Sequence, residues 1–125
     1  MQNIIIKKKE DSPKVILDYV NGLLEFEGEC YPENAFEFFE PILEWIEEYI
    51  KNSDKKTTIN FKLSYFNSAT TQILFDIFDI LDENSDKDIT INWYYDESNK
   101  GSLTDYEEFS DEFESLDIKA IPLQG

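Results

Sequence analysis

The chain contains no histidine and a single cysteine, Cys30, among its 125 residues. Without histidine, a catalytic triad with an imidazole base and a His-ligated zinc site are both excluded. One cysteine cannot form an intramolecular disulfide framework. Cys30 precedes an expected helix but has no basic neighbour in the sequence. The absence of a basic neighbour favours a structural or unreactive thiol over a reactive one.

Glycine is also scarce, with four residues at positions 22, 28, 101 and 125 and no cluster, so a Gly-rich phosphate loop is missing. The acidic run 82–88 fails as an EF-hand, because Lys87 stands where the loop needs glycine and Trp93 where it needs the closing glutamate. The remaining carboxylates fall on helix faces expected to be solvated, with no sign of a substrate cleft. We therefore expect no catalytic residues, no metal site and no cofactor, and hence a protein that is not an enzyme.

Long apolar runs are missing as well. The run Ile4-Ile5-Ile6 is too short for the core of a signal peptide, and no later stretch approaches a membrane span, so we expect a cytoplasmic protein. Acidic residues number 28 against 11 lysines and arginines, giving a formal charge of −17. This charge argues against nucleic-acid and anionic membrane partners and favours basic protein surfaces.

What the chain does contain is a hydrophobic content of 41%, with ten Phe, seven Tyr and two Trp. This composition is typical of a packed globule, and the length fits one domain. We expect residues 1–12, which include Lys7-Lys8-Lys9, to be a flexible N-terminal arm. Residues 13–125 are then the single folded domain.

Hydrophobic periodicity predicts a β-hairpin followed by three helix–strand pairs. The hairpin joins strands 15–20 and 23–27 through Asn21-Gly22. The expected helices cover residues 32–51, 67 to about 83, and 103–113, and the further strands cover 57–66, 88–96 and 118–123. Strands separated by helices imply right-handed crossovers and parallel pairing. The sequence thus predicts an α/β domain with a mixed, mostly parallel sheet.

Alternation along the strands predicts that the helices lie mainly on one face of this sheet and that the other face is polar and open. The residues expected on the core side of the third strand are Ile59, Phe61, Leu63 and Tyr65, and those on the open face include Asn60, Lys62, Ser64, Asn92 and Tyr94. The first helix is expected to bury a stripe formed by Phe36, Phe39, Leu43, Ile46 and Ile50.

The expected strand 57–66 is followed directly by a helix that begins in the run Asn67-Ser68-Ala69-Thr70-Thr71. The hydroxyl of Ser68 therefore lies at the N-terminus of this helix. A helix N-terminus has unpaired N–H groups and partial positive charge, so it favours an anion. Acidic residues make up more than a fifth of the chain, yet none lies between Lys55 and Phe75. The pattern leaves an anion site empty beside Ser68, a serine that a kinase could phosphorylate.

Two other interpretations fit the same residues. Asn67 or Ser68 can simply cap the helix, since both residue types are preferred at that position. A central strand is often poor in charge, which accounts for residues 57–66 better than for the first helical turn, Ala69 to Gln72.

Three segments together resemble the SiaC-like regulatory phosphoproteins of bacteria. They are Gly28-Glu29-Cys30-Tyr31-Pro32-Glu33-Asn34, Leu63-Ser64-Tyr65-Phe66-Asn67-Ser68-Ala69 and Trp93-Tyr94-Tyr95-Asp96, and the resemblance covers roughly residues 12–122. It implies a small α/β fold loosely like that of anti-sigma-factor antagonists. It also implies partner switching, in which a cognate protein kinase and a metal-dependent Ser/Thr phosphatase act on the adaptor. The unphosphorylated form is expected to bind and activate a diguanylate cyclase, which raises cyclic-di-GMP and promotes biofilm growth.

The resemblance assigns the phosphoacceptor to Ser68, with Thr70 and Thr71 as fallback acceptors. Serine here replaces the threonine of a known family member. Tyr65 and Asn67, and the run Tyr31, Pro32, Glu33 and Asn34, are implied as partner-binding residues. That run equally fits a helix start with proline in the first turn. Two alternative functions stay open: a constitutive interaction module that uses the open sheet face, and an anti-sigma-factor antagonist.

Overall fold

The computed structural model describes residues 1–123, apart from the side chain of Lys100. The chain forms strands and helices in the order β1 (Ile4–Ile6), β2 (Lys14–Asp18), β3 (Leu23–Cys30), α1 (Ala35–Asn52), β4 (Thr57–Phe66), α2 (Ser68–Glu83), β5 (Ile89–Tyr95), α3 (Lys100–Glu112) and β6 (Ile118–Pro122). This is the predicted order with one additional strand at the N-terminus.

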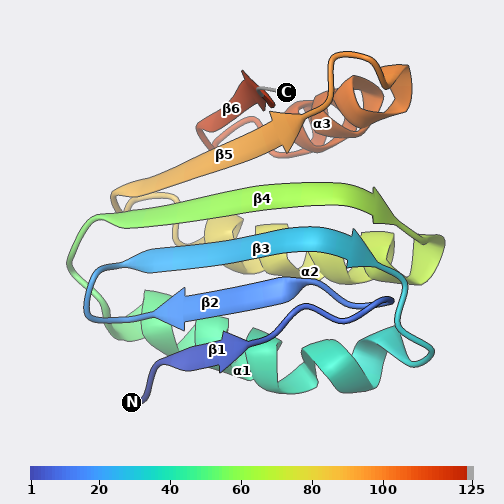
Figure 1. Ribbon diagram of the computed structural model, residues 1–125. Helices are drawn as coiled ribbons and strands as arrows, with labels where there is room; N and C mark the ends of the chain where they lie inside the picture. The colour runs from blue at the N-terminus through green and yellow to red at the C-terminus, as the bar shows by residue number, and fades with distance from the viewer. Residues whose placement is uncertain (124–125) are drawn as a thin grey trace.

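The strands form one six-stranded sheet whose spatial order is the order of the chain, β1-β2-β3-β4-β5-β6. β1 pairs with β2 and β2 with β3 in antiparallel fashion, whereas β3, β4, β5 and β6 pair in parallel. Figure 1 shows α1 and α2 behind the sheet, with α3 beside β5 and β6. The predicted single α/β domain with a mixed, mostly parallel sheet is confirmed.

The N-terminal segment is not the free arm predicted for residues 1–12. Ile5 pairs with Ile16 in an antiparallel ladder, so β1 forms the edge of the sheet. The indole Nε1 of Trp45 donates a hydrogen bond of 2.7 Å to the carbonyl of Gln2, which ties the first residues to α1. Three consecutive isoleucines have high strand propensity once a partner strand is available. Their ladder with β2 accounts for the difference.

The predicted hairpin between β2 and β3 is confirmed, but its loop has four residues, 19–22, because Asp18 pairs with Leu23. The carboxylate of Asp18 accepts hydrogen bonds from the backbone and side chain of Asn21, which lower its pKa. Within this loop, only Gly22 has a positive φ, of 65°. A Cβ at this glycine would lie 2.4 Å from the carbonyl oxygen of Lys56, so the turn requires glycine.

Stacked aromatic rings form the centre of the core and join the sheet to the helices. The Phe61 ring lies 5.4 Å from Phe26 on β3 and 5.3 Å from Phe78 on α2. Phe109 on α3 lies 4.8 Å from Phe78 and 5.2 Å from Trp93 on β5. Such pairs add stability beyond their buried area. This stack holds α2 and α3 against the same side of the sheet, and it leaves the other side open.

The buried stripe of α1 is shifted from the predicted one. Its members are Ala35, Phe39, Ile42, Trp45, Ile46, Tyr49 and Ile50. Phe36, predicted to be buried, is 63% exposed because it lies at the flank of this stripe in the first turn. An exposed phenylalanine therefore stands at the N-terminal end of α1.

Candidate functional site

The carboxyl ends of three parallel strands meet at one edge of the sheet, where each strand is followed by a helix (Figure 1). All three helices are capped by asparagine: Asn34 for α1, Asn67 for α2 and Asn99 for α3. Each amide oxygen accepts a 3.0 Å hydrogen bond from a backbone N–H of the first turn. We call this side of the molecule, formed by residues 28–37, 63–71 and 96–102, the capped edge. It gathers three positive helix ends.

Ser68 is the first residue of α2 and is exposed at the capped edge. Asn67 takes the N-cap position and satisfies the N–H of Thr70, so the helix does not use the serine as its cap. Within the described part of the chain, the Ser68 hydroxyl makes no hydrogen bond. The first turn of α2 contains no acidic residue. The structure thus separates the capping role from the residue predicted to accept a phosphate.

The two fallback acceptors are placed less favourably. Thr70 is 0% exposed, and its Oγ1 donates a 3.2 Å hydrogen bond to the carbonyl of Cys30. A kinase could reach this hydroxyl only after α2 detached from β3. Thr71 is half-buried, and its Oγ1 donates to the carbonyl of Asn67 at 3.2 Å. Of the three candidate hydroxyls, only that of Ser68 is exposed and without a hydrogen-bond partner among the described residues.

Tyr65 does not face the core as predicted, because β4 contains a β-bulge. Gly28 pairs with Leu63 and Glu29 with Tyr65, so Ser64 has no partner on β3. An extra residue reverses the alternation of side chains beyond it. Since Glu29 faces away from the helices, Tyr65 does so too, and its side chain is 54% exposed. The bulge converts a predicted core residue into a surface residue three positions before Ser68.

The two tyrosines that were predicted as partner-binding residues come together. The Tyr31 and Tyr65 rings lie 5.9 Å apart in an edge-to-face arrangement. Partial burial raises the pKa of Tyr31, and the nearby Glu29, Glu10 and Asp11 carboxylates add to this effect. The pair joins the end of β4 to the segment that follows β3. It therefore forms a small aromatic surface beside the start of α2.

The rest of the run Tyr31–Asn34 lies in the connection that leads to α1. Pro32 is half-buried and precedes the N-cap by two residues, so it is not in the first helical turn as predicted. Glu33 and Asn34 are exposed, and Asn34 accepts the N–H of Glu37. The asparagine therefore has a capping role, whatever else the run does.

A hollow of about 230 Å³ beside Tyr65 was missed from the sequence. It is lined by the ends of β4 and β5 and by the start of α3, including Ser64, Asn99, Ser102 and Asp105. Partial burial raises the pKa of Asp105, with a contribution from Glu108. The turn residues of the segment Asp96–Asn99 mark the start of α3. Nothing in the local sequence shows that the start of α3 lines the same hollow as Tyr65.

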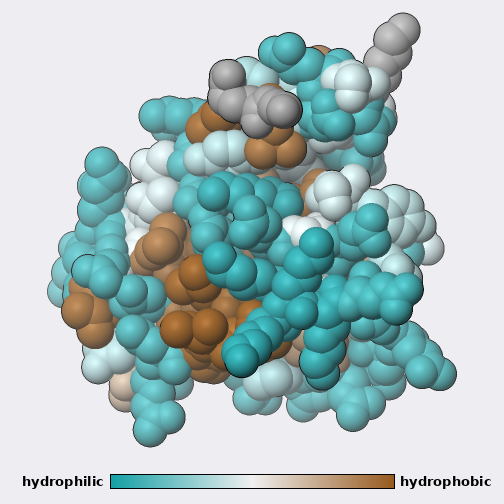
Figure 2. Space-filling view, viewed as in Figure 1, coloured by the Kyte–Doolittle hydropathy of each residue, from teal (hydrophilic) through white to brown (hydrophobic). Residues whose placement is uncertain are grey.

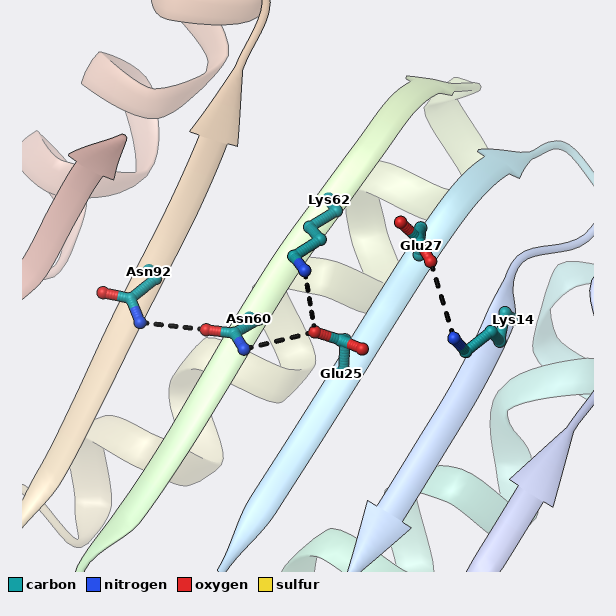
Figure 3. A network of polar contacts seen from close by, with 6 residues as sticks. All are labelled: Lys14, Glu25, Glu27, Asn60, Lys62 and Asn92. Atoms are coloured by element: carbon teal, nitrogen blue, oxygen red, sulfur yellow. Dashed lines mark hydrogen bonds and ion pairs between the residues drawn. The ribbon is translucent and has the colours of Figure 1, made fainter. Parts of the chain in front are cut away.

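The open face of the sheet carries a polar network across three strands (Figure 3). Asn92 donates to Asn60 at 2.9 Å, and Asn60 donates to Glu25 at 3.3 Å. Glu25 also pairs with Lys62 at 3.0 Å, which raises the pKa of the lysine. Lys62 lies 5.0 Å from the centre of the Tyr94 ring. The expectation of a polar face with Asn60, Lys62, Asn92 and Tyr94 is confirmed.

Next to this network the open face becomes apolar. Figure 2 shows a hydrophobic patch over the part of the sheet formed by β1, β2 and β3. Ile5 pairs with Ile16, Ile16 pairs with Glu25, and Leu23 faces the same way as Glu25. Ile5 is 74% exposed. The open face is therefore divided between a polar and an apolar half.

Within residues 1–123, no group of three or more Cys, Asp or Glu side chains is arranged to hold a metal ion. None of the described helices is both long and apolar enough to cross a membrane.

The fold and the capped edge define a small α/β domain that presents a serine hydroxyl at a helix N-terminus. The chain belongs to the SiaC family of regulatory phosphoproteins, whose family profile matches residues 6–123.

Individual relatives agree with this assignment. An uncharacterised protein of Pseudomonas aeruginosa (strain UCBPP-PA14) is 26% identical over 114 residues, which is 90% of each chain. The crystal structure of apo-SiaC from P. aeruginosa superimposes with a TM-score of 0.90 at 25% identity, covering 97% of this chain and 99% of that one. SiaC in complex with the diguanylate cyclase SiaD, which it activates, gives a TM-score of 0.90 at 24% identity over 96% and 99% of the two chains.

Proposed function

We propose that this protein is a non-enzymatic adaptor whose partner binding is switched by reversible phosphorylation of Ser68. A cognate protein kinase adds the phosphate and a metal-dependent Ser/Thr phosphatase removes it, both in the cytoplasm. The unmodified form binds and activates a diguanylate cyclase. This part of the proposal is supported by SiaC of P. aeruginosa, which forms a complex with the diguanylate cyclase SiaD and is its activator. The family assignment supports the regulatory role, and the capped edge supports the site.

The observation that carries the proposal is the exposed Ser68 hydroxyl at a helix end whose cap is supplied by another residue. A phosphate adds a charge of about −1.5 to −2. At the N-terminus of α2 this charge is favourable by about 1 kcal/mol or less, because the helix dipole and the free N–H groups attract it. Phosphorylation would therefore leave the fold intact and change only the surface that a partner meets.

The surface around Ser68 explains how one phosphate can alter binding. The exposed Tyr65 and the half-buried Tyr31 offer aromatic area, and tyrosine is a residue type that anchors protein interfaces. A dianion placed at the rim of this area must lose its water shell when a partner covers it, and that loss is unfavourable without a matching cation. A partner with an arginine there would gain instead. The same modification can thus repel one partner and recruit another.

Phosphorylation by the native kinase tests the site. We expect intact-mass spectrometry to show a single added phosphate on the wild type and none on Ser68→Ala, while Thr71→Ala serves as a matched control and is modified normally. Binding to the cyclase should be retained by Ser68→Ala and lost by the phosphorylated wild type. A phosphate that persists on Ser68→Ala would move the site elsewhere.

The open face favours a second candidate, a constitutive interaction module that needs no modification. Its support is the uncovered apolar patch with Ile5 and Ile16 next to the polar network. Tyr65→Ala and Ile16→Ser discriminate between the two functions in a cyclase pull-down. Loss of binding with Ile16→Ser alone, together with equal recovery of phosphorylated and unmodified protein, would favour the module. An anti-sigma-factor antagonist would use the same Ser68 switch and differ only in its partner.

A further inference from the structure

The loop between β1 and β2 brings Lys7, Lys8 and Lys9 to the capped edge. Figure 1 shows this loop running alongside the end of β3 and the connection that leads to α1. The backbone N–H of Tyr31 donates a 2.8 Å hydrogen bond to the carbonyl of Asp11, which anchors the loop there. A segment that the sequence predicts to be a free arm is therefore held against Tyr31, at the same edge of the sheet as the candidate phosphorylation site.

The loop and the start of α2 flank the same two residues. Asp11 is bonded to Tyr31, while the N–H of Asn67 donates to the carbonyl of Cys30 at 3.3 Å. Hydrogen-bonded neighbouring backbones lie about 5 Å apart. Asp11 and Asn67 flank the segment Cys30–Tyr31, so their backbones are about 10 Å apart. Lys9 lies two residues before Asp11, and lysine has a long, flexible stem that carries a point charge. This stem leaves the Lys9 ammonium free to turn toward a phosphate on the residue after Asn67.

Gly28 gives the loop room to lie on the sheet. A Cβ at this position would be 3.0 Å from Cε and 3.3 Å from Cδ of Lys8, and the glycine has a φ of 122°. The stem of Lys8 therefore rests directly on β3 at the bulge. Lys8 thus contacts the strand one residue before Glu29, which pairs with Tyr65.

The three ammonium groups have no fixed partner. None of Lys7, Lys8 and Lys9 forms an ion pair with a described residue, in a chain with 28 acidic residues. The nearby acids Glu10 and Asp11 balance their charge without binding them. A phosphate dianion is a stronger acceptor than a carboxylate, with three oxygens for charge-assisted hydrogen bonds. The loop thus holds uncommitted cations next to a predicted phosphate.

We propose that the β1–β2 loop is a built-in phosphate receptor, in which Lys8 and Lys9 bind the phosphate on Ser68. This inference rests on the proposed function, because it requires that Ser68 is the modified residue. When the lysines turn to the phosphate, the loop closes over the aromatic pair of Tyr31 and Tyr65. The modified protein then hides the surface that the unmodified form offers to its partner.

The test installs phosphoserine at position 68 during synthesis through a reassigned codon, so it does not depend on a kinase. The second ionisation of the phosphate is followed by ³¹P NMR in three proteins that share the phosphoserine. One has no other change, one carries Lys8→Gln and Lys9→Gln, and a control of equal charge carries Lys56→Gln and Lys119→Gln. Both control lysines are exposed and form no ion pair with described residues.

We expect the loop variant to have a phosphate pKa about half a unit higher than the other two proteins, because nearby cations favour the dianion. The amide resonances of residues 7–12 should shift with phosphate ionisation in the control but not in the loop variant. Equal pKa values in the loop variant and the control would overturn the inference. Failure of the proposed function would appear differently, as a kinase that does not modify Ser68.

Discussion

Replacing Asn67 and Ser68 separately tests whether the helix cap and the predicted phosphoacceptor are different residues. Asn67→Ala removes the amide oxygen that accepts the Thr70 N–H at 3.0 Å, at a half-buried position. Loss of such a cap costs about 1 kcal/mol, within a range of about 0.5–2 kcal/mol. For a chain of this size, that corresponds to a fall in melting temperature of about 4 °C. Ser68→Ala removes a hydroxyl without a bond and introduces a better helix former, so its stability should change by less than about 0.5 kcal/mol.

Urea unfolding followed by far-UV circular dichroism measures both differences on the same scale, provided that the dependence on urea is unchanged. Ala69→Gly, an exposed change in the same turn, controls for altered helix propensity. If Ser68→Ala destabilises the protein as much as Asn67→Ala does, the serine shares the capping role. The assignment of its hydroxyl as uncommitted would then be wrong, and a phosphate there would disturb the helix.

Three further predictions concern the scaffold. Gly22→Ala should lower the free energy of unfolding by more than about 2 kcal/mol, because φ is 65° and the new Cβ would lie 2.4 Å from a backbone carbonyl oxygen. Gly101→Ala, whose Cβ would have no contact under 3.3 Å, should lower it far less in the same urea assay. Burial raises the pKa of Cys30 from 9.0 to about 11, so its alkylation at pH 8 should be slow until urea unfolds the protein. The folded state also holds the thiol proton more tightly than the unfolded state does. The free energy of unfolding should therefore fall as the pH rises from about 9 to 11. Glu25→Gln should lower the pKa of the Lys62 ammonium, as seen by NMR titration, since the hydrogen bond from Lys62 to Glu25 is the main cause of its raised value.

The elements with strong local signals could be predicted from the sequence. Strand β4, Thr57–Phe66, has the predicted bounds because its alternation ends at Asn67, a helix-capping residue type. The hairpin between β2 and β3 follows from Gly22, which supplies the only left-handed residue that the turn needs. In both cases the residues that decide the structure are neighbours in the chain.

The parts that could not be predicted depend on contacts between distant segments. Tyr65 faces outward because Ser64 is left unpaired opposite β3, and a single strand does not reveal its register with another. Ile4–Ile6 becomes a strand only beside β2. The location of Ser68 could be predicted, but its free hydroxyl and the burial of Thr70 depend on how α2 meets Cys30.

The spatial order of the strands in the sheet is their order in the sequence, so each strand after β1 pairs with the strand that precedes it in the chain. As the chain leaves the ribosome, every new β-α unit can dock on a neighbour that is already present, without waiting for a distant segment. The start of α3 lines the hollow beside Tyr65, so the capped edge is complete only after this third helix has docked.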